Sequence, residues 1–176
     1  MVAISVVWKF LYQPDFGLFN SILSALGLPP QKWLTSPTLA MPSIVVMSVW
    51  QGLGYNMILF MAGLLDIPEV FYEVADIDGA NAWNKFKNIT VPLLKPTFLF
   101  IVVISSIGSF QVFTQPYLMT HGGPEDSTRV IVQYIQHKAF DTLLMGYGSA
   151  MAFILFAIII SITMIELKFL RTRWKY

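Results

Sequence analysis

The sequence contains no cysteine and little charge. Without Cys, the chain can form neither disulfide bonds nor Cys-based metal sites. Charged residues make up 12% of the chain, about half of the ~25% usual in soluble domains, and hydrophobic residues make up 56%. No G-x-x-x-x-G-K-S/T phosphate loop is present, so if the function requires nucleotide hydrolysis, another chain would have to carry it out. This composition indicates a membrane protein.

The charges that remain are unevenly placed. Three windows hold none of them: 33–65, 97–124 and 142–165. Each window exceeds the roughly 20 residues that a helix needs to cross a hydrocarbon core of about 30 Å. Helices satisfy their own backbone hydrogen bonds in lipid, so they are the expected spanning elements. We therefore predict an all-α, polytopic membrane bundle with spans at 39–64, 97–119 and 145–167.

The N-terminal stretch 1–12 is apolar apart from Lys9. A helix of this length rises only about 18 Å, which is too short to cross the core. A signal peptide is disfavoured because the Lys lies in the middle and no small-residue cleavage site follows cleanly. We interpret residues 1–12 as the last part of a spanning helix whose start is missing, and the chain as a C-terminal fragment.

Basic residues predict the orientation of the spans. The 66–95 loop and the tail hold seven (Lys85, Lys87, Lys95, Lys168, Arg171, Arg173 and Lys175), and the opposite connections hold three (Lys32, Arg129 and Lys138). Because cytoplasmic segments carry the excess of Lys and Arg, we expect loop 65–96 and tail 168–176 in the cytoplasm. Segments 13–38 and 120–144 are then on the outer side.

The outer segments offer little chemistry. Phe19, Ile22, Leu23 and Leu26 have helical spacing, which predicts a short helix. This helix lies either on the membrane surface, with Trp33 at the interface, or against neighbouring helices. His121 and His137 have no paired ligands, so we expect surface residues and no metal site.

The stretch YEVADIDGANAWNKFKNITVP (72–92) belongs to the most ordered-looking loop. Asp66 can form a capping box with Glu69, with Pro68 in the first turn of the helix. Gly79 can end that helix in the left-handed conformation, and Asn81 can cap a second short helix. Pro92 and Pro96 mark the end of this second helix and the re-entry into lipid. We therefore predict a compact pair of helices around a Gly hinge.

Five acids cluster in this loop: Asp66, Glu69, Glu73, Asp76 and Asp78. A solvated cytoplasmic loop would explain them without any partner. Two features favour a partner. The cytoplasmic membrane surface is itself anionic and would repel these acids, and Val70, Val74 and Ile77 form an apolar stripe on the same helix. A protein with a basic, partly apolar groove would suit both features.

The run Glu73-Val74-Ala75-Asp76-Ile77-Asp78-Gly79-Ala80, followed by Phe86, Ile89 and Val91-Pro92, resembles the signature loop of one family. That family is the permease subunits of binding-protein-dependent ABC importers. The stretches WKFLYQPDFGLFN, LLDIPEVFYEVADIDGANAW, FQVFTQPYLMTHGGP and AFDTLLMGYGSAMAFILF resemble its sugar-importer branch, akin to the maltose and glycerol-phosphate permeases. Val74 and Val91 depart from the pattern by apolar swaps. The family usually has six spans, so the first two and part of the third are absent here.

The resemblance implies a type I permease fold in which loop 65–96 carries a coupling helix, seated in a groove of a separate ATPase subunit. The implied coupling residues are Glu69, Glu73, Ala75, Asp76, Asp78, Gly79 and Ala80. Of these, Glu73 would pair with a basic residue of the groove, Gly79 would give the turn, and Ala75 and Ala80 would permit close approach. The implied partners are two ATPase copies, a second permease and an external solute-binding protein in a prokaryotic cell membrane, with no cofactor and no nucleic acid.

Polar residues group in two of the spans. Small and polar residues in lipid-embedded helices are most often packing contacts, but their grouping also suits a watery path for an uncharged polyol. In the maltose-type permeases the sugar lies between these two helices. The matching positions are Ser48, Gln51, Gly52 and Tyr55 in one span and Ser105, Gly108 and Ser109 in the other. Gly108 stands where the maltose permease has an aromatic residue, so the solute is expected to differ.

Other functions fit less well. An intramembrane enzyme would need a paired acid, a Ser–His arrangement or H-E-x-x-H within the spans, and the sequence has none of these. A structural or accessory membrane subunit explains the hydropathy but leaves the acidic loop unexplained. A permease for a non-sugar solute such as glycerol phosphate is the remaining alternative. We predict a sugar-importer permease subunit that performs no covalent chemistry.

Overall fold

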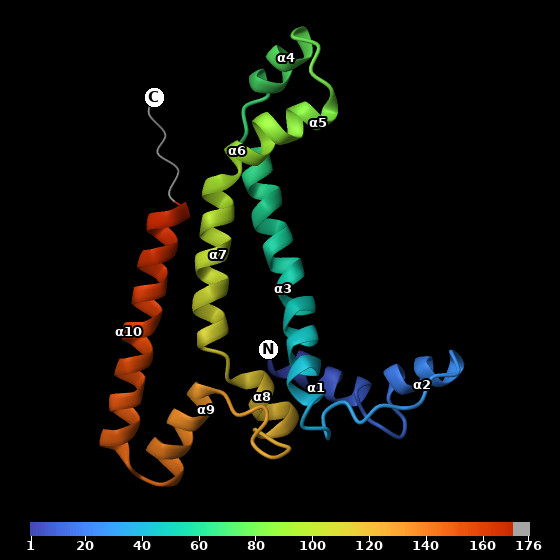
Figure 1. The fold of residues 1–176 in the computed structure, drawn as a ribbon, viewed down its shortest axis with the longest axis vertical. Coiled ribbons are helices and arrows are strands. Elements are labelled where there is room, and N and C mark those ends of the chain that lie inside the picture. The colour runs from blue at the N-terminus through green and yellow to red at the C-terminus, as the bar shows by residue number, and fades with distance from the viewer. Residues whose placement is uncertain (171–176) are drawn as a thin grey trace. The chain divides into compact units, whose positions relative to one another are not determined.

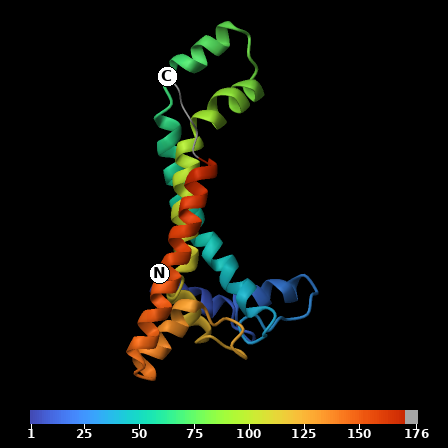
Figure 2. The ribbon, with the colours of Figure 1, turned by 60° about the vertical axis from the view of Figure 1, so that its left-hand side comes forward.

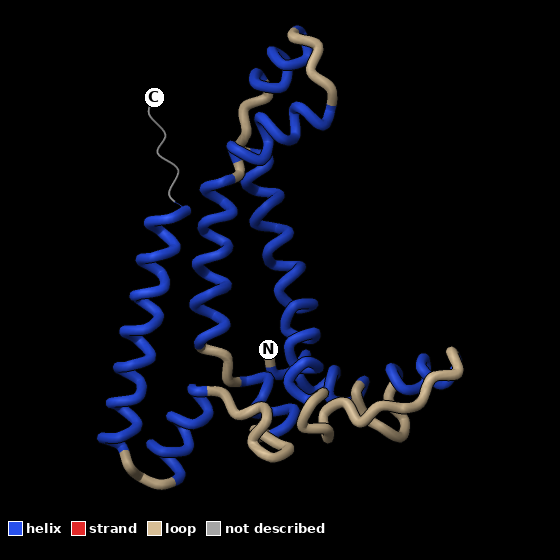
Figure 3. The backbone as a smooth tube through the Cα atoms, viewed as in Figure 1, coloured by secondary structure: helices blue, strands red, loops and turns tan. Residues whose placement is uncertain are grey.

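The computed structural model describes residues 1–170, and this part consists of helices and loops without any strand (Figures 1 and 3). The all-α prediction is therefore confirmed. The predicted tail 168–176 lies largely outside the described residues. The chain divides into two compact units, and each is described by itself. Unit 1 comprises 1–51 and 109–156, and unit 2 comprises 52–108 and, within the described part, 157–170.

Two helices are long and apolar enough to cross a membrane. They are α3 (Ala40–Leu65) and α10 (Met145–Leu170), each of 26 residues. Such a helix is about 39 Å long, which exceeds the hydrocarbon core. A third span is present if the helical run Ala82–Leu93 and α7 (Lys95–Phe110) are counted together, although they meet at a bend of 57°. The first and third predicted spans therefore correspond to single continuous helices.

The second predicted span, 97–119, is divided between two helices. Helix α7 ends at Phe110, and after a short break α8 (Thr114–Thr120) begins. Pro116 lies in the first turn of α8 and has no N–H to donate to the carbonyl of Val112. A straight helix through 112–116 would leave that carbonyl without its partner, which gives a physical reason for the break.

In unit 1, an aromatic cluster holds the N-terminal segments together. Trp8 and Tyr12, at the end of α1 (Val2–Leu11), are buried with Met47 of α3. Phe19 of α2 (Leu18–Ala25) lies with its ring centroid 4.9 Å from that of Tyr12. Trp33 packs on the same rings and donates from Nε1 to Asn20 Oδ1 at 2.8 Å. Phe19 of this short helix therefore packs against α1, whereas Ile22 and Leu26 of the same predicted stripe are exposed.

Segment 120–144 of unit 1, predicted to be on the outer side, contains one more short helix, α9 (Ile131–Gln136), which continues as a π-helical turn over His137–Asp141. Before it, the loop after α8 is closed by the fully buried Thr128, which shares a hydrogen bond with Thr120 at 2.7 Å. The Thr128 hydroxyl also lies 2.9 Å from the carbonyl of Gly123, to which it donates. The Gly-rich turn is therefore an ordered part of the unit.

In unit 2, residues 66–93 form a compact structure between α3 and α7, which we call the knob. It contains α4 (Val70–Ile77), α5 (Ala82–Lys85), a π-helical turn over Phe86–Thr90 and the short α6 (Val91–Leu93) (Figures 1 and 2). Pro92 lies inside this helical run, which ends at Leu93, between the two prolines predicted to mark its end. Because Pro92 cannot donate a backbone hydrogen bond, the widened π turn before it accommodates the proline.

The boundaries between the two units fall inside the three long helices. They lie between Gln51 and Gly52 in α3, between Gly108 and Ser109 in α7, and between Phe156 and Ala157 in α10. The first two boundaries coincide with residues that the sequence analysis assigned to a solute path.

Candidate coupling surface and solute path

The ends of the short helices in the knob are set by two residues that the sequence identified. Gly79 has φ +71°, the left-handed conformation predicted for it, and the N–H of Ala80 donates to the carbonyl of Ala75 at 2.9 Å. The side chain of Asn81 accepts from the N–H of Asn84 at 2.8 Å, so the predicted cap of α5 is confirmed. The predicted capping box is wrong, because α4 begins after Glu69 and no side chain caps it.

Two side-chain contacts join α4 to the later part of the knob, residues 85–90. Tyr72 of α4 and Thr90 of the π turn share a hydrogen bond of 2.9 Å, and Thr90 is buried. Lys85 forms an ion pair with Asp76. One of the five acids of this loop is therefore neutralised within the knob, so Asp76 contributes less free charge to a partner than the sequence implied.

The outer surface of α4 combines exposed acids with exposed apolar side chains. Glu69, Glu73 and Asp78 are exposed, and none of them forms an ion pair among the described residues. Val74 and Ile77 are 53% and 86% exposed, and no residue of α4 is buried. Exposed apolar surface on an ordered helix is typical of a protein contact. The knob thus presents a preformed surface of mixed character, and the residues predicted for coupling, other than Asp76, lie on α4, directly before it or in the turn that ends it.

The four path residues of α3 follow one stripe of the helix. Ser48, Gln51, Gly52 and Tyr55 are spaced by three, one and three residues, which places them on one side. The Ser48 hydroxyl donates to the carbonyl of Ile44 in its own helix at 2.8 Å, and the Gln51 amide donates to Met1 Sδ. Tyr55 is 58% exposed within this chain. None of these side chains fills the core of the chain.

The three path residues of α7 also share one side, since Ser105, Gly108 and Ser109 are spaced by three and one residues. All three are exposed within this chain. A Cβ added at Gly108 would meet no atom within 4 Å, and one added at Gly52 would meet only the Asn56 amide at 3.9 Å. Packing inside this chain therefore does not explain why these two positions are glycine.

Closer to the knob, α3 and α7 are in tight contact. A Cβ added at Gly63 would lie 2.9 Å from Thr97 Cγ2, and the rings of Phe60 and Phe98 have centroids 6.5 Å apart. Figures 1 and 2 both show the two helices meeting beside the knob. The glycines of these helices thus divide into two kinds. Gly63 is required by helix packing, whereas Gly52 and Gly108 border open space.

The structure also shows contacts that sequence reasoning missed. Lys9, the one charge of the N-terminal stretch, donates to the carbonyl of Leu118 at 3.1 Å. It lines a pocket of about 340 Å³ in unit 1, together with Tyr12 and Thr120. In unit 2, the Ser106 hydroxyl donates to Glu166 Oε1 of α10. The sequence offered one signal for this pair, a carboxylate near the end of an apolar helix.

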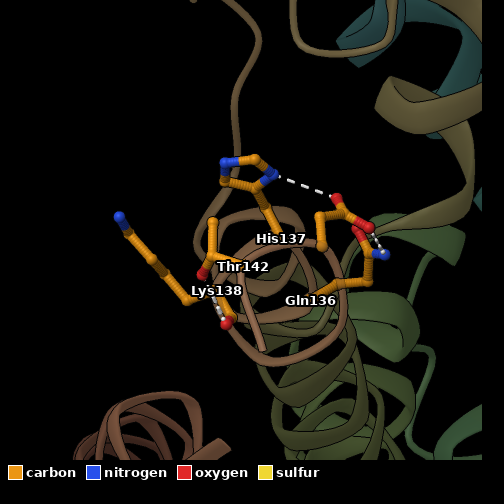
Figure 4. Close-up of polar contacts among 5 residues, drawn as sticks. Gln136, His137, Lys138 and Thr142 are labelled. Carbon is orange, nitrogen blue, oxygen red and sulfur yellow. Dashed lines mark hydrogen bonds and ion pairs between the residues drawn. The ribbon is translucent and has the colours of Figure 1, made fainter. Parts of the chain in front are cut away.

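The outer histidines lie in separate environments. His121 has φ +53° and ends α8. His137 Nδ1 lies 3.0 Å from Asp141 Oδ2, and Gln136 Nε2 donates to Oδ1 of the same carboxylate at 3.4 Å (Figure 4). Within residues 1–170, no group of three His, Cys, Asp or Glu side chains could hold a metal ion.

Comparison with known proteins identifies a family that covers the chain. Residues 1–175 match the family described as "binding-protein-dependent transport system inner membrane component". The chain belongs to this family of permease subunits. The resemblance found in the knob motif and in the other quoted stretches is therefore confirmed.

Curated relatives of the chain are likewise named as permease proteins. The chain is 36% identical over 174 residues to the probable ABC transporter permease protein YurN of Bacillus subtilis, covering 98% of the chain and 60% of that protein. It is 38% identical over 166 residues to the trehalose/maltose permease MalF of Thermococcus litoralis, covering 94% and 56%. It is 34% identical over 169 residues to the arabinooligosaccharide permease AraP of Bacillus subtilis, covering 95% and 54%. The chain thus spans little more than half the length of these permeases.

A solved structure shares the fold. The crystal structure of a bacterial ABC transporter that imports the acidic polysaccharide alginate matches with a TM-score of 0.87 at 24% identity. The match covers 99% of this chain and 61% of the other. At this identity the likeness establishes the fold alone, which is that of an ABC-importer permease.

Proposed function

We propose that this chain is part of the membrane-spanning subunit of an ATP-driven importer that translocates a carbohydrate delivered by an external binding protein. The knob would dock on an ATPase subunit, and the polar sides of α3 and α7 would line the solute path. The observation that carries the proposal is the knob itself. It is an ordered structure with exposed acids and exposed apolar side chains, in a chain that belongs to a transport family.

Docking on an ATPase subunit follows from the surface of α4. Glu73 is an exposed acid between Val70 and Val74, which are about half exposed. A groove with a basic residue and apolar walls would satisfy both kinds of side chain. Pairing of desolvated charges is worth ~1.5–7 kcal/mol at close range in measured interfaces, so Glu73 is the expected determinant of docking. The Gly79 turn and the Tyr72–Thr90 hydrogen bond would keep the surface rigid when force is applied to it.

A carbohydrate is the expected solute because of the groups that the path residues offer. They provide hydroxyls, an amide, a phenol and open space beside two glycines, and none of them is charged. Such groups exchange hydrogen bonds with sugar hydroxyls. A phosphate-bearing solute such as glycerol phosphate would favour a Lys or Arg in the path, and these stripes contain neither. The relatives named for trehalose/maltose and arabinooligosaccharides support the same class of solute.

The orientation follows from the basic residues. The excess of Lys and Arg around the knob and in the tail places both on the cytoplasmic side, where an ATPase subunit has access to them. The α8–α9 region is then external, where the binding protein docks. A second permease subunit would complete the path, since one stripe on each of two helices does not enclose a solute.

The test uses the permease expressed with its complete transport system. Affinity purification through the permease should recover an ATPase subunit, and proteoliposomes should accumulate a radiolabelled sugar or oligosaccharide only with ATP and the binding protein. Purification without any ATPase subunit would favour an accessory membrane protein. Uptake of a phosphorylated polyol, with no uptake from a panel of neutral carbohydrates, would overturn the solute class and leave the transport role intact.

A further inference from the structure

Glu166 is an unusual residue in α10. It is the one acid among residues 145–170, and within the chain most of this apolar helix is exposed. The Ser106 hydroxyl of α7 donates to its Oε1 at 2.5 Å, and its other carboxylate oxygen is also buried. Ionisable groups in spanning helices are costly and are retained mainly where they serve a function. Packing of α10 alone therefore does not explain why this apolar helix contains a carboxylate.

Both residues belong to unit 2, which also contains the knob and the α3–α7 contact beside it. Ser106 marks the side of α7 that faces α10. Thr97 and Phe98 mark the side that faces α3, since Thr97 meets Gly63 and the Phe98 ring lies near that of Phe60. Helix α7 is thus attached to two neighbours from two different sides.

Helix geometry connects these attachments to the solute path. At about 3.6 residues per turn, Phe98 lies about 80° around the helix axis from Ser106. Ser105, Gly108 and Ser109 lie about 60° to 160° from Ser106 in the same direction. The path residues of α7 are therefore on the side that faces α3. A rotation of α7 about its axis would turn them away.

We propose that Glu166 is a positioning residue. By accepting the hydrogen bond from Ser106, it fixes the rotation of α7, and so keeps Ser105 and Gly108 directed toward α3. It also links α10 to the knob through α7, so that motion of the knob carries the polar side of α7 with it. This inference rests on the proposed transport function and assigns a role to a pair of residues outside the path itself.

The transport experiment compares four variants in the complete, reconstituted importer. Ser106→Ala removes the donor, and Glu166→Leu removes the acceptor. Each should raise KM for the solute or lower the solute moved per ATP by about three- to fivefold, the factor that one interhelical hydrogen bond is worth. Glu166→Gln keeps an Oε1 acceptor and should behave as wild type. Ser161→Ala is the matched control, because the Ser161 hydroxyl donates to Ala157 in its own helix.

A second measurement reports the contact without transport. Because these 176 residues contain no Cys, a pair of cysteines at positions 106 and 166 would be the one pair within them that a short bifunctional thiol reagent can link in native membranes. Mass spectrometry should find this pair linked, and a control pair at 106 and 161 unlinked. Position 161 is five residues from 166, about 140° around α10.

The outcomes are distinguishable. Wild-type KM and wild-type solute moved per ATP in Ser106→Ala would overturn the positioning role. A loss in Glu166→Gln as large as in Glu166→Leu would also overturn it, because the effect would then not depend on the hydrogen bond. An absent 106–166 link in assembled importers would overturn the contact. Wild-type proteoliposomes that take up no carbohydrate would instead contradict the proposed function, whatever the cross-link shows.

Discussion

Each residue proposed for this site acts by position and not by reactivity. The path residues offer hydroxyl, amide and phenol groups on one side of each helix, and Gly52 and Gly108 leave space beside them. Such groups could exchange hydrogen bonds with the hydroxyls of a solute. On the knob, Glu73 is exposed and free to meet a basic side chain, whereas Asp76 already pairs with Lys85. Single substitutions can therefore test the path and the coupling surface separately.

Glu73→Lys should uncouple the importer. Reversing this charge places a cation against the basic groove expected in the ATPase subunit. Uptake and solute-stimulated ATP hydrolysis should both fall more than about tenfold, since loss of one close charge pair already costs ~1.4 kcal/mol or more. The measurement is ATP hydrolysis by reconstituted importer with and without the loaded binding protein. Permease yield in the membrane should stay normal.

Glu125→Lys is the control for Glu73→Lys, because it makes the same charge change in the outer turn. It should leave stimulated ATP hydrolysis close to wild type. Unchanged stimulated hydrolysis in Glu73→Lys would contradict the assignment of this residue to the coupling surface.

Gly52→Trp should block the solute path. A Cβ added at Gly52 meets only the Asn56 amide within this chain, at 3.9 Å, so a side chain can begin there without a clash. It would occupy the space beside Ser48 and Tyr55. Uptake should fall to background, while ATPase subunits still co-purify. The control is Gly54→Trp, two residues away and so on the opposite side of α3, where an added Cβ meets no atom within 4 Å. Equal uptake by the two variants would contradict the path.

At the scale of elements, the knob depends on its glycine turn. Gly79 has φ +71°, a conformation that costs an L-residue ~1–2 kcal/mol. Gly79→Val should therefore loosen the junction of α4 and α5 and lower the yield of ATPase subunit that co-purifies. Gly27→Val is matched to it, with φ +73° and equally open surroundings, but it follows α2 in unit 1. It should leave ATPase recovery unchanged. Similar losses in both variants would indicate general destabilisation and not a coupling role.

The sequence predicted the elements whose signals are local. Apolar windows predicted α3 and α10, and turn chemistry predicted Gly79 and Asn81. The stretch 97–119 is not one continuous helix, a break that hydropathy could not predict because it does not register a lost backbone donor. Pro116 carried that information. The capping box failed because the chain around Ile67 and Pro68 leaves α3 as a bend, and α4 begins only after Glu69.

Contacts between distant residues could not be predicted from pattern. Ser106 and Glu166 are sixty residues apart, and Lys9 meets a carbonyl at Leu118. Each requires the packing of helices to be known. The path residues are intermediate between the elements predicted from local signals and the contacts that could not be predicted. Their spacing placed them on one side of each helix, but only the open space at Gly52 and Gly108 separates them from packing residues such as Gly63.

At the scale of the whole molecule, the features described above are divided between the two units. Unit 1 holds the aromatic cluster and the ordered outer turn, and unit 2 holds the knob and the Ser106–Glu166 contact. The boundaries lie within helices, next to Gly52 and Gly108. The chain of 176 residues spans 60% or less of the length of the curated relatives described above.

The central claim is that the knob docks on an ATPase subunit, and site-specific cross-linking tests it most directly. Because these 176 residues contain no Cys, Ile77→Cys gives the one thiol among them, on the most exposed apolar residue of α4. Leu143→Cys, 75% exposed in the outer segment, is the control. In membranes that contain the complete importer, Cys at position 77 should link to an ATPase subunit and Cys at position 143 should not. Links from position 77 to lipid alone, or equal yields from both positions, would contradict the account.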